Sequence, residues 1–124
     1  MILGSLIKDF YCSLRNDRHE ILADIDDKLG GTDRGQNPHE LLESALSACT
    51  IMTIQSYAKR KGYILDTLEV KVSIEKEGEE NLITKEITFP DSLDEEVKSK
   101  LLQIASKCPI HKLLTSNVTI ETTH

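Results

Sequence analysis

The feature that most constrains the fold is a long helix without a charged face. Between Ser44 and Ala58 the chain has no charged residue, although 29% of all its residues are charged. At about 100° per residue, both sides of a helix through this segment are apolar or small and neutral. We therefore expect a central helix that is buried all round, with small residues that let another backbone approach closely.

Both ends of this helix are marked in the sequence. Asn37 suits the N-cap, Pro38 suits the first helical position, and Glu40 is placed to complete a capping box. Three cations, Lys59, Arg60 and Lys61, suit the C-terminal end of the helix dipole, and a glycine follows at position C′. The sequence therefore predicts one helix from Pro38 to Lys61.

Shorter patterns predict strands and a second helix. The segments that alternate as strands do are Leu6–Leu14, His19–Ile25, Thr67–Glu75 and Leu82–Phe89. Ser92 and Glu95 form a second capping box at the start of an amphipathic helix that Pro109 limits, and Val118–Thr122 is interpreted as a last strand. The order ββαββαβ with antiparallel hairpins is an α+β fold, expected as a single domain over residues 1–124.

Charge and hydropathy argue against several classes of partner. The formal net charge is −6 and no basic block or stripe occurs, which argues against nucleic acid and anionic membrane surfaces. The longest uncharged run is too short to span a bilayer, and the first residues lack the features of a signal peptide. We therefore expect a cytoplasmic protein whose thiols are mostly kept reduced, with no membrane partner.

The three cysteines are the main candidates for chemistry. Cys49 lies in the middle of the central helix, and Cys108 ends the second helix on its apolar face. Both face the place where the two helices should pack, so they are a candidate redox pair if their Cα atoms approach to within about 7 Å. They can also simply fill space, because free cysteines are among the most buried residues. Cys12 has no such companion and is interpreted as a core or interface residue.

Other chemistries have weaker signals. Cys108 and His111 have the C-x-x-H spacing of half a zinc site, but no second half with matching spacing exists, so no metal is expected. A nucleophile–base pair of Cys49 and His111 is possible in principle. The glycine-rich segment LGGTDRG lacks the lysine and the strand–helix context of a phosphate-binding loop, and no cofactor is expected.

Two segments of the sequence resemble the OsmC/Ohr family of organic hydroperoxide reductases. They are HEILADIDDKLGGTDRGQNPHELLESALSACTIMT and LLQIASKCPIHKLL, and the resemblance extends from His19 to Thr122. It depends on the combination of a glycine-rich loop, N-P-x-E-L-L, a small-residue helix with its cysteine, and a later C-P-x-H. The resemblance implies an OsmC-like fold: an intertwined homodimer in which antiparallel sheets wrap two central helices.

The resemblance also implies a chemistry. The expected activity is a thiol-dependent peroxidase that reduces organic hydroperoxides in defence against oxidative stress. By position, Cys49 would be the peroxidatic cysteine and Cys108 the resolving cysteine, and a dithiol would reduce their disulfide. A second cysteine next to the first traps the reversible sulfenic acid before it is oxidised further. The alternative is a non-enzymatic OsmC-like dimer that binds an apolar small molecule.

The site differs from the family pattern in its carboxylate. Ohr-type members place a glutamate two residues after the asparagine of the N-P motif, where this chain has His39. Glu40 is next to it, but on a helical wheel Glu40 lies nearly opposite Cys49 while His39 lies closer. Glu40 is therefore interpreted mainly as the capping residue, and His39 as a supporting residue.

The expected cation of the site is an arginine. A thiol buried among apolar side chains has a raised pKa, so Cys49 needs a positive neighbour. The dipole of its own helix fades within the first turn and is too far away. Ohr-type members use an arginine, and the candidates here are Arg15, Arg18 and Arg34. Arg34 is favoured, because its glycine-rich loop must fold over the start of the helix.

Overall fold

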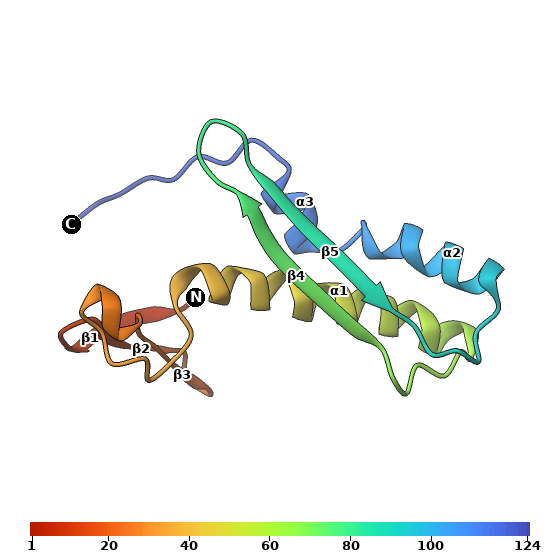
Figure 1. Cartoon of the computed structure of the whole chain (residues 1–124), viewed down its shortest axis with the longest axis horizontal. Helices are drawn as coiled ribbons and strands as arrows, with labels where there is room; N and C mark the ends of the chain where they lie inside the picture. Colours follow the sequence, from red (N-terminus) through yellow and green to blue (C-terminus); the bar gives the residue numbers. More distant parts are fainter. The chain divides into compact units, whose positions relative to one another are not determined.

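The structure is a computed structural model that describes all 124 residues, and the chain forms two compact units, Met1–Leu42 and Glu43–His124 (Figure 1). The elements are β1 (Leu3–Lys8), β2 (Tyr11–Arg15), β3 (Glu20–Ala23), the 3-10 helix η1 (Asp27–Leu29), α1 (Pro38–Lys61), β4 (Glu69–Lys76), β5 (Leu82–Thr88), α2 (Glu95–Ala105) and α3 (Pro109–Leu114). Helix α1 crosses the boundary between the units. The α+β class predicted from the sequence is confirmed.

The first unit is built on a three-stranded antiparallel sheet in the order β1–β2–β3. The prediction of one strand over Leu6–Leu14 is wrong, because the chain turns at Asp9 and Leu6 pairs with Cys12 across the resulting hairpin. Asp9 has a φ of 55°, in the left-handed region that aspartate tolerates better than most residues. Apolar residues keep the same every-second-residue pattern before and after this turn, so the sequence pattern does not reveal the turn.

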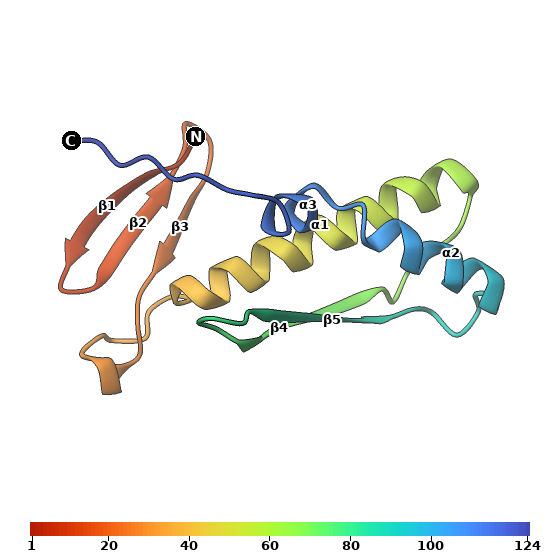
Figure 2. The same ribbon diagram turned by 90° about the horizontal axis from the view of Figure 1, so that it is seen from above.

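The second unit packs the β4–β5 hairpin against helices. Figures 1 and 2 show the hairpin alongside α1, with α2 next to the C-terminal half of α1. The strands are antiparallel, with Val72 opposite Lys85 and Ile74 opposite Ile83. Ile54 of α1 packs with Leu101 and Ala105 of α2 in the buried core. Partly buried residues of both helices, both strands and the connecting segments surround that core: Tyr57, Leu65, Leu68, Ile87, Phe89, Leu93 and Val97.

Both predicted ends of α1 are confirmed. The Glu40 N–H donates to Asn37 Oδ1 at 2.9 Å, and the Asn37 N–H donates to Glu40 Oε1 at 3.3 Å, which completes the capping box. At the other end the Tyr63 N–H donates to the Ala58 carbonyl at 2.9 Å, and Gly62 has a φ of 76°. This closing turn needs a left-handed residue, which glycine supplies without strain.

Within the second unit helix α1 is not buried all round, and burial of its remaining side in a dimer stays a prediction. Its buried residues recur every fourth position: Leu46, Thr50, Ile54 and Ala58. Another side stays open, where Ala45 and Ala48 are exposed and Met52 is 68% exposed. The β4–β5 hairpin and α2 cover only part of the helix surface. An apolar face of α1 is therefore left uncovered in this unit.

The chain has no helix with the length and hydropathy that a membrane span requires.

The C-terminal part differs from the sequence prediction at both ends of α2. The helix begins after Asp94, with no side-chain cap bond, because the chain first turns through a bond from the Leu93 N–H to the Pro90 carbonyl at 3.2 Å. The predicted capping box at Ser92 is therefore not formed. The helix ends at Ala105, and Cys108 instead caps α3, which the sequence analysis missed.

The predicted strand Val118–Thr122 is not formed in the structure. This segment has no strand ladder, and Ile120 in it is 84% exposed. Alternating apolar residues become a strand only when the edge of a neighbouring strand is available to pair with them. Within this chain the segment pairs with neither sheet.

Candidate functional site

The structure brings Cys49 and Cys108 together inside the second unit. Cys49 is half-buried on α1, one residue before the fully buried Thr50. Cys108 is fully buried where the chain passes from α2 to α3. Both are free thiols, and they lie within hydrogen-bonding reach of one another. Two thiols from different elements therefore meet in one place, as their apolar positions suggested.

Cys108 is the thiol with the more favourable surroundings for a negative charge. Its sulfur accepts a hydrogen bond from the His111 N–H at 3.5 Å. Burial acts to raise the pKa of Cys108, but hydrogen bonds from the Cys49 thiol, the His111 N–H and the Thr50 hydroxyl act against it. The net result is a pKa of Cys108 below that of an ordinary thiol.

Cys49 has the opposite shift. Burial raises the pKa of the Cys49 thiol, and the hydrogen bond and negative charge that it shares with Cys108 raise it further. Weaker hydrogen bonds from the Ile110 N–H and Thr53 do not reverse the direction. Of the two thiols, Cys108 is therefore the one whose surroundings favour the charged form.

Lys85 of β5 is a site residue that the sequence analysis missed. Its Nζ donates to Thr50 Oγ1 at 3.3 Å and to the Ala105 carbonyl at 3.0 Å. Burial lowers the pKa of Lys85, whereas negative charge on Cys108 and Cys49 raises it. The sequence did contain a signal for Lys85. Ile83, Lys85 and Ile87 lie on the same face of the strand, and a lysine between two apolar residues of an inner face is unusual.

His111, on α3, is the fourth polar residue around the thiols. The contact that it makes with the pair is the backbone hydrogen bond to Cys108. Burial and the positive charge of Lys85 lower the pKa of the imidazole, which favours its neutral form at neutral pH. No group of three or more His, Cys, Asp or Glu side chains in the chain is placed to hold a metal ion.

An open groove of about 700 Å³ gives the thiol pair a route to solvent. Cys49 lines it together with apolar residues such as Ala48, Met52 and Ile104, and Arg60 and Lys107 also contribute. Cys108 is not part of the lining. The thiol that a molecule entering this groove meets is therefore Cys49, with the buried Cys108 behind it.

Arg34, the favoured arginine, is anchored within the first unit. Its Nε donates to Thr32 Oγ1 at 2.7 Å and lies 3.7 Å from Asp24 Oδ2, and its guanidinium carbon is 3.9 Å from the ring centroid of Tyr11. Burial opposes ionisation of Asp24, but hydrogen bonds from Thr32 and from the Ile25 and Arg34 N–H groups hold the pKa of that carboxyl below its usual value. A role of Arg34 beside Cys49 stays a prediction.

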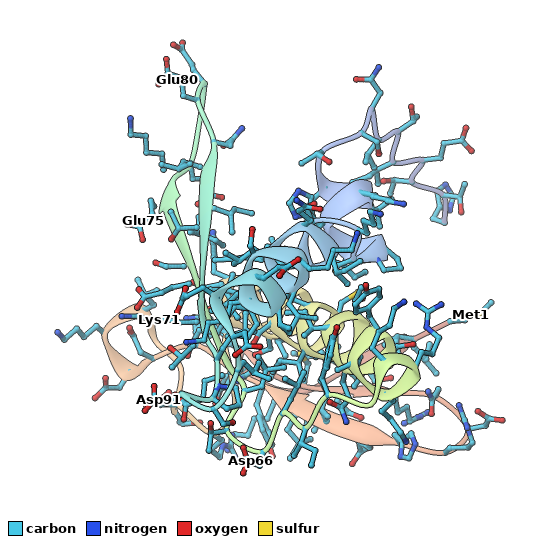
Figure 3. The ribbon with its side chains drawn as sticks, turned by 90° about the vertical axis from the view of Figure 1, so that its right-hand side faces the viewer. Met1, Asp66, Lys71, Glu75, Glu80 and Asp91 are labelled. Carbon is cyan, nitrogen blue, oxygen red and sulfur yellow. The ribbon has the colours of Figure 1, made fainter.

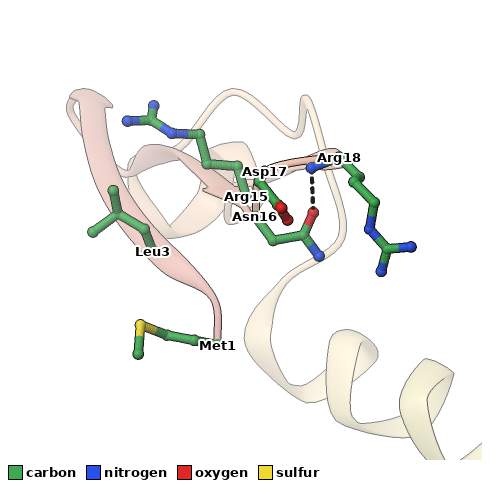
Figure 4. A pocket seen from close by; sticks show the side chains of 6 residues that line it. All are labelled: Met1, Leu3, Arg15, Asn16, Asp17 and Arg18. Carbon is green, nitrogen blue, oxygen red and sulfur yellow. Dashed lines mark hydrogen bonds between the residues drawn. The ribbon is translucent and has the colours of Figure 1, made fainter.

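The remaining candidates are in the first unit. Glu40 is engaged in the capping box, and His39 is exposed on the first turn of α1. Arg15 and Arg18 line a pocket at the β2–β3 turn (Figure 4), where the Arg18 N–H donates to Asn16 Oδ1 at 2.9 Å. This asparagine-centred turn explains why the chain reverses after β2.

The comparisons with known proteins give one family match and several similar folds. The family described as OsmC-like protein matches residues 31–123. No protein of curated function matches. Among solved structures, one assigned to the osmotic stress and detoxification response of Psychrobacter arcticus 273-4 is similar at a TM-score of 0.78 and 20% identity, over 90% of this chain and 85% of that one.

Two further structures are similar at comparable coverage. An OsmC-like protein from Mycoplasma pneumoniae has a TM-score of 0.73 and 24% identity, over 92% of this chain and 85% of that one. An organic hydroperoxide resistance protein from Elizabethkingia anophelis, with thiocyanate bound, has a TM-score of 0.67 and 19% identity, over 94% of this chain and 89% of that one. At these identities the likeness is one of fold.

Proposed function

Because the chain belongs to the OsmC-like protein family, we propose that it is a cysteine peroxidase that reduces organic hydroperoxides. A redox role agrees with structural neighbours named organic hydroperoxide resistance proteins. The observation that carries the proposal is the pairing of Cys49, which lines an open groove, with the buried Cys108 within hydrogen-bonding reach. We assign Cys49 as peroxidatic because it is the accessible thiol, and Cys108 as resolving.

The reaction proceeds in three balanced steps. The Cys49 thiolate attacks the terminal oxygen of R–O–O–H, the O–O bond breaks, and the products are the Cys49 sulfenic acid and, after the alkoxide takes up a proton, the alcohol R–OH. The Cys108 thiolate then attacks the sulfenic sulfur, which forms the disulfide and, with one proton, releases water. A dithiol finally reduces the disulfide by thiol–disulfide exchange and is itself oxidised.

The low pKa of Cys108 fits this sequence of steps. Transfer of the shared proton from Cys49 to Cys108 moves the negative charge onto the accessible sulfur when a hydroperoxide is in the groove. The proton that Cys108 receives then passes to the leaving alkoxide, which becomes the alcohol, so Cys108 is again a thiolate for the resolving step. The donors that remain around its sulfur, the His111 N–H and Thr50, favour this charged form.

The proposed assembly is a homodimer of a single OsmC-like domain. The uncovered apolar face of α1 supports it, and so do exposed apolar side chains of the β1–β2 hairpin, including Leu6 at 73% and Phe10, in its turn, at 53%. Single domains rarely leave so much apolar surface in water. The family match spans the boundary between the two units, which supports one domain. Sedimentation at micromolar concentration should give twice the chain mass, and a stable folded monomer would contradict the dimer.

The second candidate function is binding without turnover. The mainly apolar lining of the groove favours it, since such a surface holds an apolar small molecule without any reaction at sulfur. In that case Cys49 would be oxidised only slowly.

The proposed location is the cytoplasm, which maintains the dithiols that the peroxidase cycle needs.

A peroxidase assay separates the two functions. Consumption of tert-butyl hydroperoxide is followed with excess dithiothreitol, in the wild type and in Cys49→Ser, Cys108→Ser and Cys12→Ser. The proposal predicts turnover in the wild type and in Cys12→Ser, none in Cys49→Ser, and at most a strongly reduced rate in Cys108→Ser. A wild-type rate equal to that of Cys49→Ser would leave binding as the function.

A further inference from the structure

We propose that Lys85 is the counter-ion of the Cys49–Cys108 pair, and that its ammonium group holds the one negative charge that the two sulfurs share. This inference rests on the proposed function, because it names the residue that keeps the site in its reactive charge state. This cation comes from a strand of the second unit, the same unit that contains both thiols.

The ammonium group is held from both elements that position the thiols. Thr50, whose hydroxyl accepts from Lys85 at 3.3 Å, follows Cys49 directly on α1. Ala105, whose carbonyl accepts at 3.0 Å, ends α2 just before the turn that carries Cys108. An ammonium group has three N–H donors, so these two bonds leave one for a sulfur. The lysine is thereby fixed at the junction of α1, α2 and β5.

Lys85 is partly buried in the sheet, where a negative partner stabilises its charge. The side chain lies on the inner face of β5, opposite Val72 and between Ile83 and Ile87. A charge in such surroundings is costly unless it is paired and hydrogen-bonded. Negative charge on Cys108 and Cys49 acts to restore the protonated form of Lys85 against the effect of burial. The lysine and the thiol pair therefore stabilise each other's charged forms.

The titratable groups that face one another here come from each surrounding element. They are Cys49 from α1, Lys85 from β5, Cys108 from the α2–α3 turn and His111 from α3, and the groove beside Cys49 is also lined by Arg60 and Lys107. Burial and the charge of Lys85 favour the neutral form of His111, so the imidazole does not compete as the cation. Among these four groups, Lys85 is thus the one that can supply a positive charge to the thiols.

The test removes the charge and keeps the volume. Lys85→Met preserves an unbranched side chain with no polar atom to satisfy, and Lys85→Arg keeps the charge. Lys71→Met is the matched control, because Lys71 lies on the exposed face of the same hairpin (Figure 3). The readouts are the pH titration of thiolate ultraviolet absorbance in the reduced protein and the rate of Cys49 alkylation, followed by peptide mass spectrometry.

The expected result is that the first thiolate midpoint rises by about 1–3 pH units in Lys85→Met, as for loss of a neighbouring opposite charge. Alkylation of Cys49 at pH 7 should slow by about tenfold or more, because the thiolate fraction falls about tenfold when the midpoint rises by one pH unit. Lys85→Arg should recover most of this loss, and Lys71→Met should match the wild type. A folded Lys85→Met with an unchanged midpoint would overturn the inference.

A reciprocal measurement covers the case in which Lys85→Met does not fold. Removing the thiolate in Cys108→Ala should lower the pKa of Lys85, read from the NMR titration of labelled lysine, because the charges stabilise each other mutually. An unchanged Lys85 pKa in that variant would also overturn the inference. Neither measurement uses a hydroperoxide, so a protein without peroxidase activity would disprove the proposed function and still leave these two results to decide the role of Lys85.

Discussion

Replacing Thr50 with valine tests the polar network behind the thiols. Thr50 is fully buried on α1, its hydroxyl contacts the Leu46 carbonyl at 2.7 Å and accepts from Lys85 at 3.3 Å, and it also lowers the pKa of Cys108. A hydroxyl has one hydrogen, so it donates either to Leu46 or to the thiolate. Valine removes these bonds and leaves nearly the same shape.

The size of the effect follows from those contacts. Lys85 keeps its bond to the Ala105 carbonyl but loses one acceptor, and because its side chain is only partly buried the loss should cost no more than about 1 kcal/mol. At about 4 °C per kcal/mol for a chain of this size, Tm should fall by no more than about 4 °C. Cys108 loses one of its three main hydrogen-bond donors, so the thiolate midpoint should rise by about 1 pH unit, as for one bond to a charged group.

The assay pairs thermal unfolding under reducing conditions with the pH titration of thiolate absorbance. Thr84→Val is the control, because Thr84 precedes Lys85 on β5 but points outward, where its hydroxyl donates to Glu75 at 3.2 Å. An exposed substitution of this kind should change stability by less than about 0.5 kcal/mol. If Thr50→Val and Thr84→Val share the wild-type thiolate midpoint, the hydroxyl does not support the thiolate and the proposed network is wrong.

Two further predictions concern stability. Leu101→Ala removes a fully buried side chain that packs on Ile54, and should lower the free energy of unfolding by about 2–5 kcal/mol in urea titrations at fixed protein concentration; a loss below about 1 kcal/mol would contradict a core centred on these residues. Asp24 has a lowered pKa in the folded state, so its contribution to stability is fully present above the ordinary aspartate pKa and is lost as pH falls through the folded value. Urea unfolding between about pH 3 and 5 should therefore show a smaller rise of stability with pH in Asp24→Asn than in the wild type, and equal slopes would refute the assignment.

The central helix could be predicted from sequence because every local signal agreed. The Asn37–Glu40 capping box, the terminal cations and Gly62 act within one or two turns of the chain, and all of them are formed as predicted. Family resemblance and fold class were equally accessible. The burial of the helix could not be predicted from the sequence, because it depends on how much of the helix surface other segments cover. Met52, for example, is 68% exposed.

The errors have identifiable physical causes. Pro109 was interpreted only as the end of a helix, although proline also suits the first position of a new one, which is its place in α3. The turn at Asp9 preserves the alternation of apolar residues and so leaves no break in the pattern. The last segment, Val118–Thr122, has the pattern of a strand, but it pairs with neither sheet of the chain.

The site shows the same division between local and tertiary information. Facing apolar positions predicted that Cys49 and Cys108 lie close together, and their role as a redox pair stays a prediction. A check of strand parity would have drawn attention to Lys85. The distribution of charge between the thiols could not be predicted, because it depends on the donors that reach each sulfur. The His111 N–H and Thr50 meet Cys108 only after α1 and α3 have packed.

The most direct test of the proposed cycle is the disulfide itself. The reduced protein is treated with one equivalent of an organic hydroperoxide, its remaining thiols are blocked by alkylation, and peptides are mapped without reduction. The account predicts a crosslink between Cys49 and Cys108 within one chain, with Cys12 still alkylated, and no crosslink in Cys49→Ser. A disulfide through Cys12, or a protein whose Cys49 remains fully alkylatable after the treatment, would contradict it.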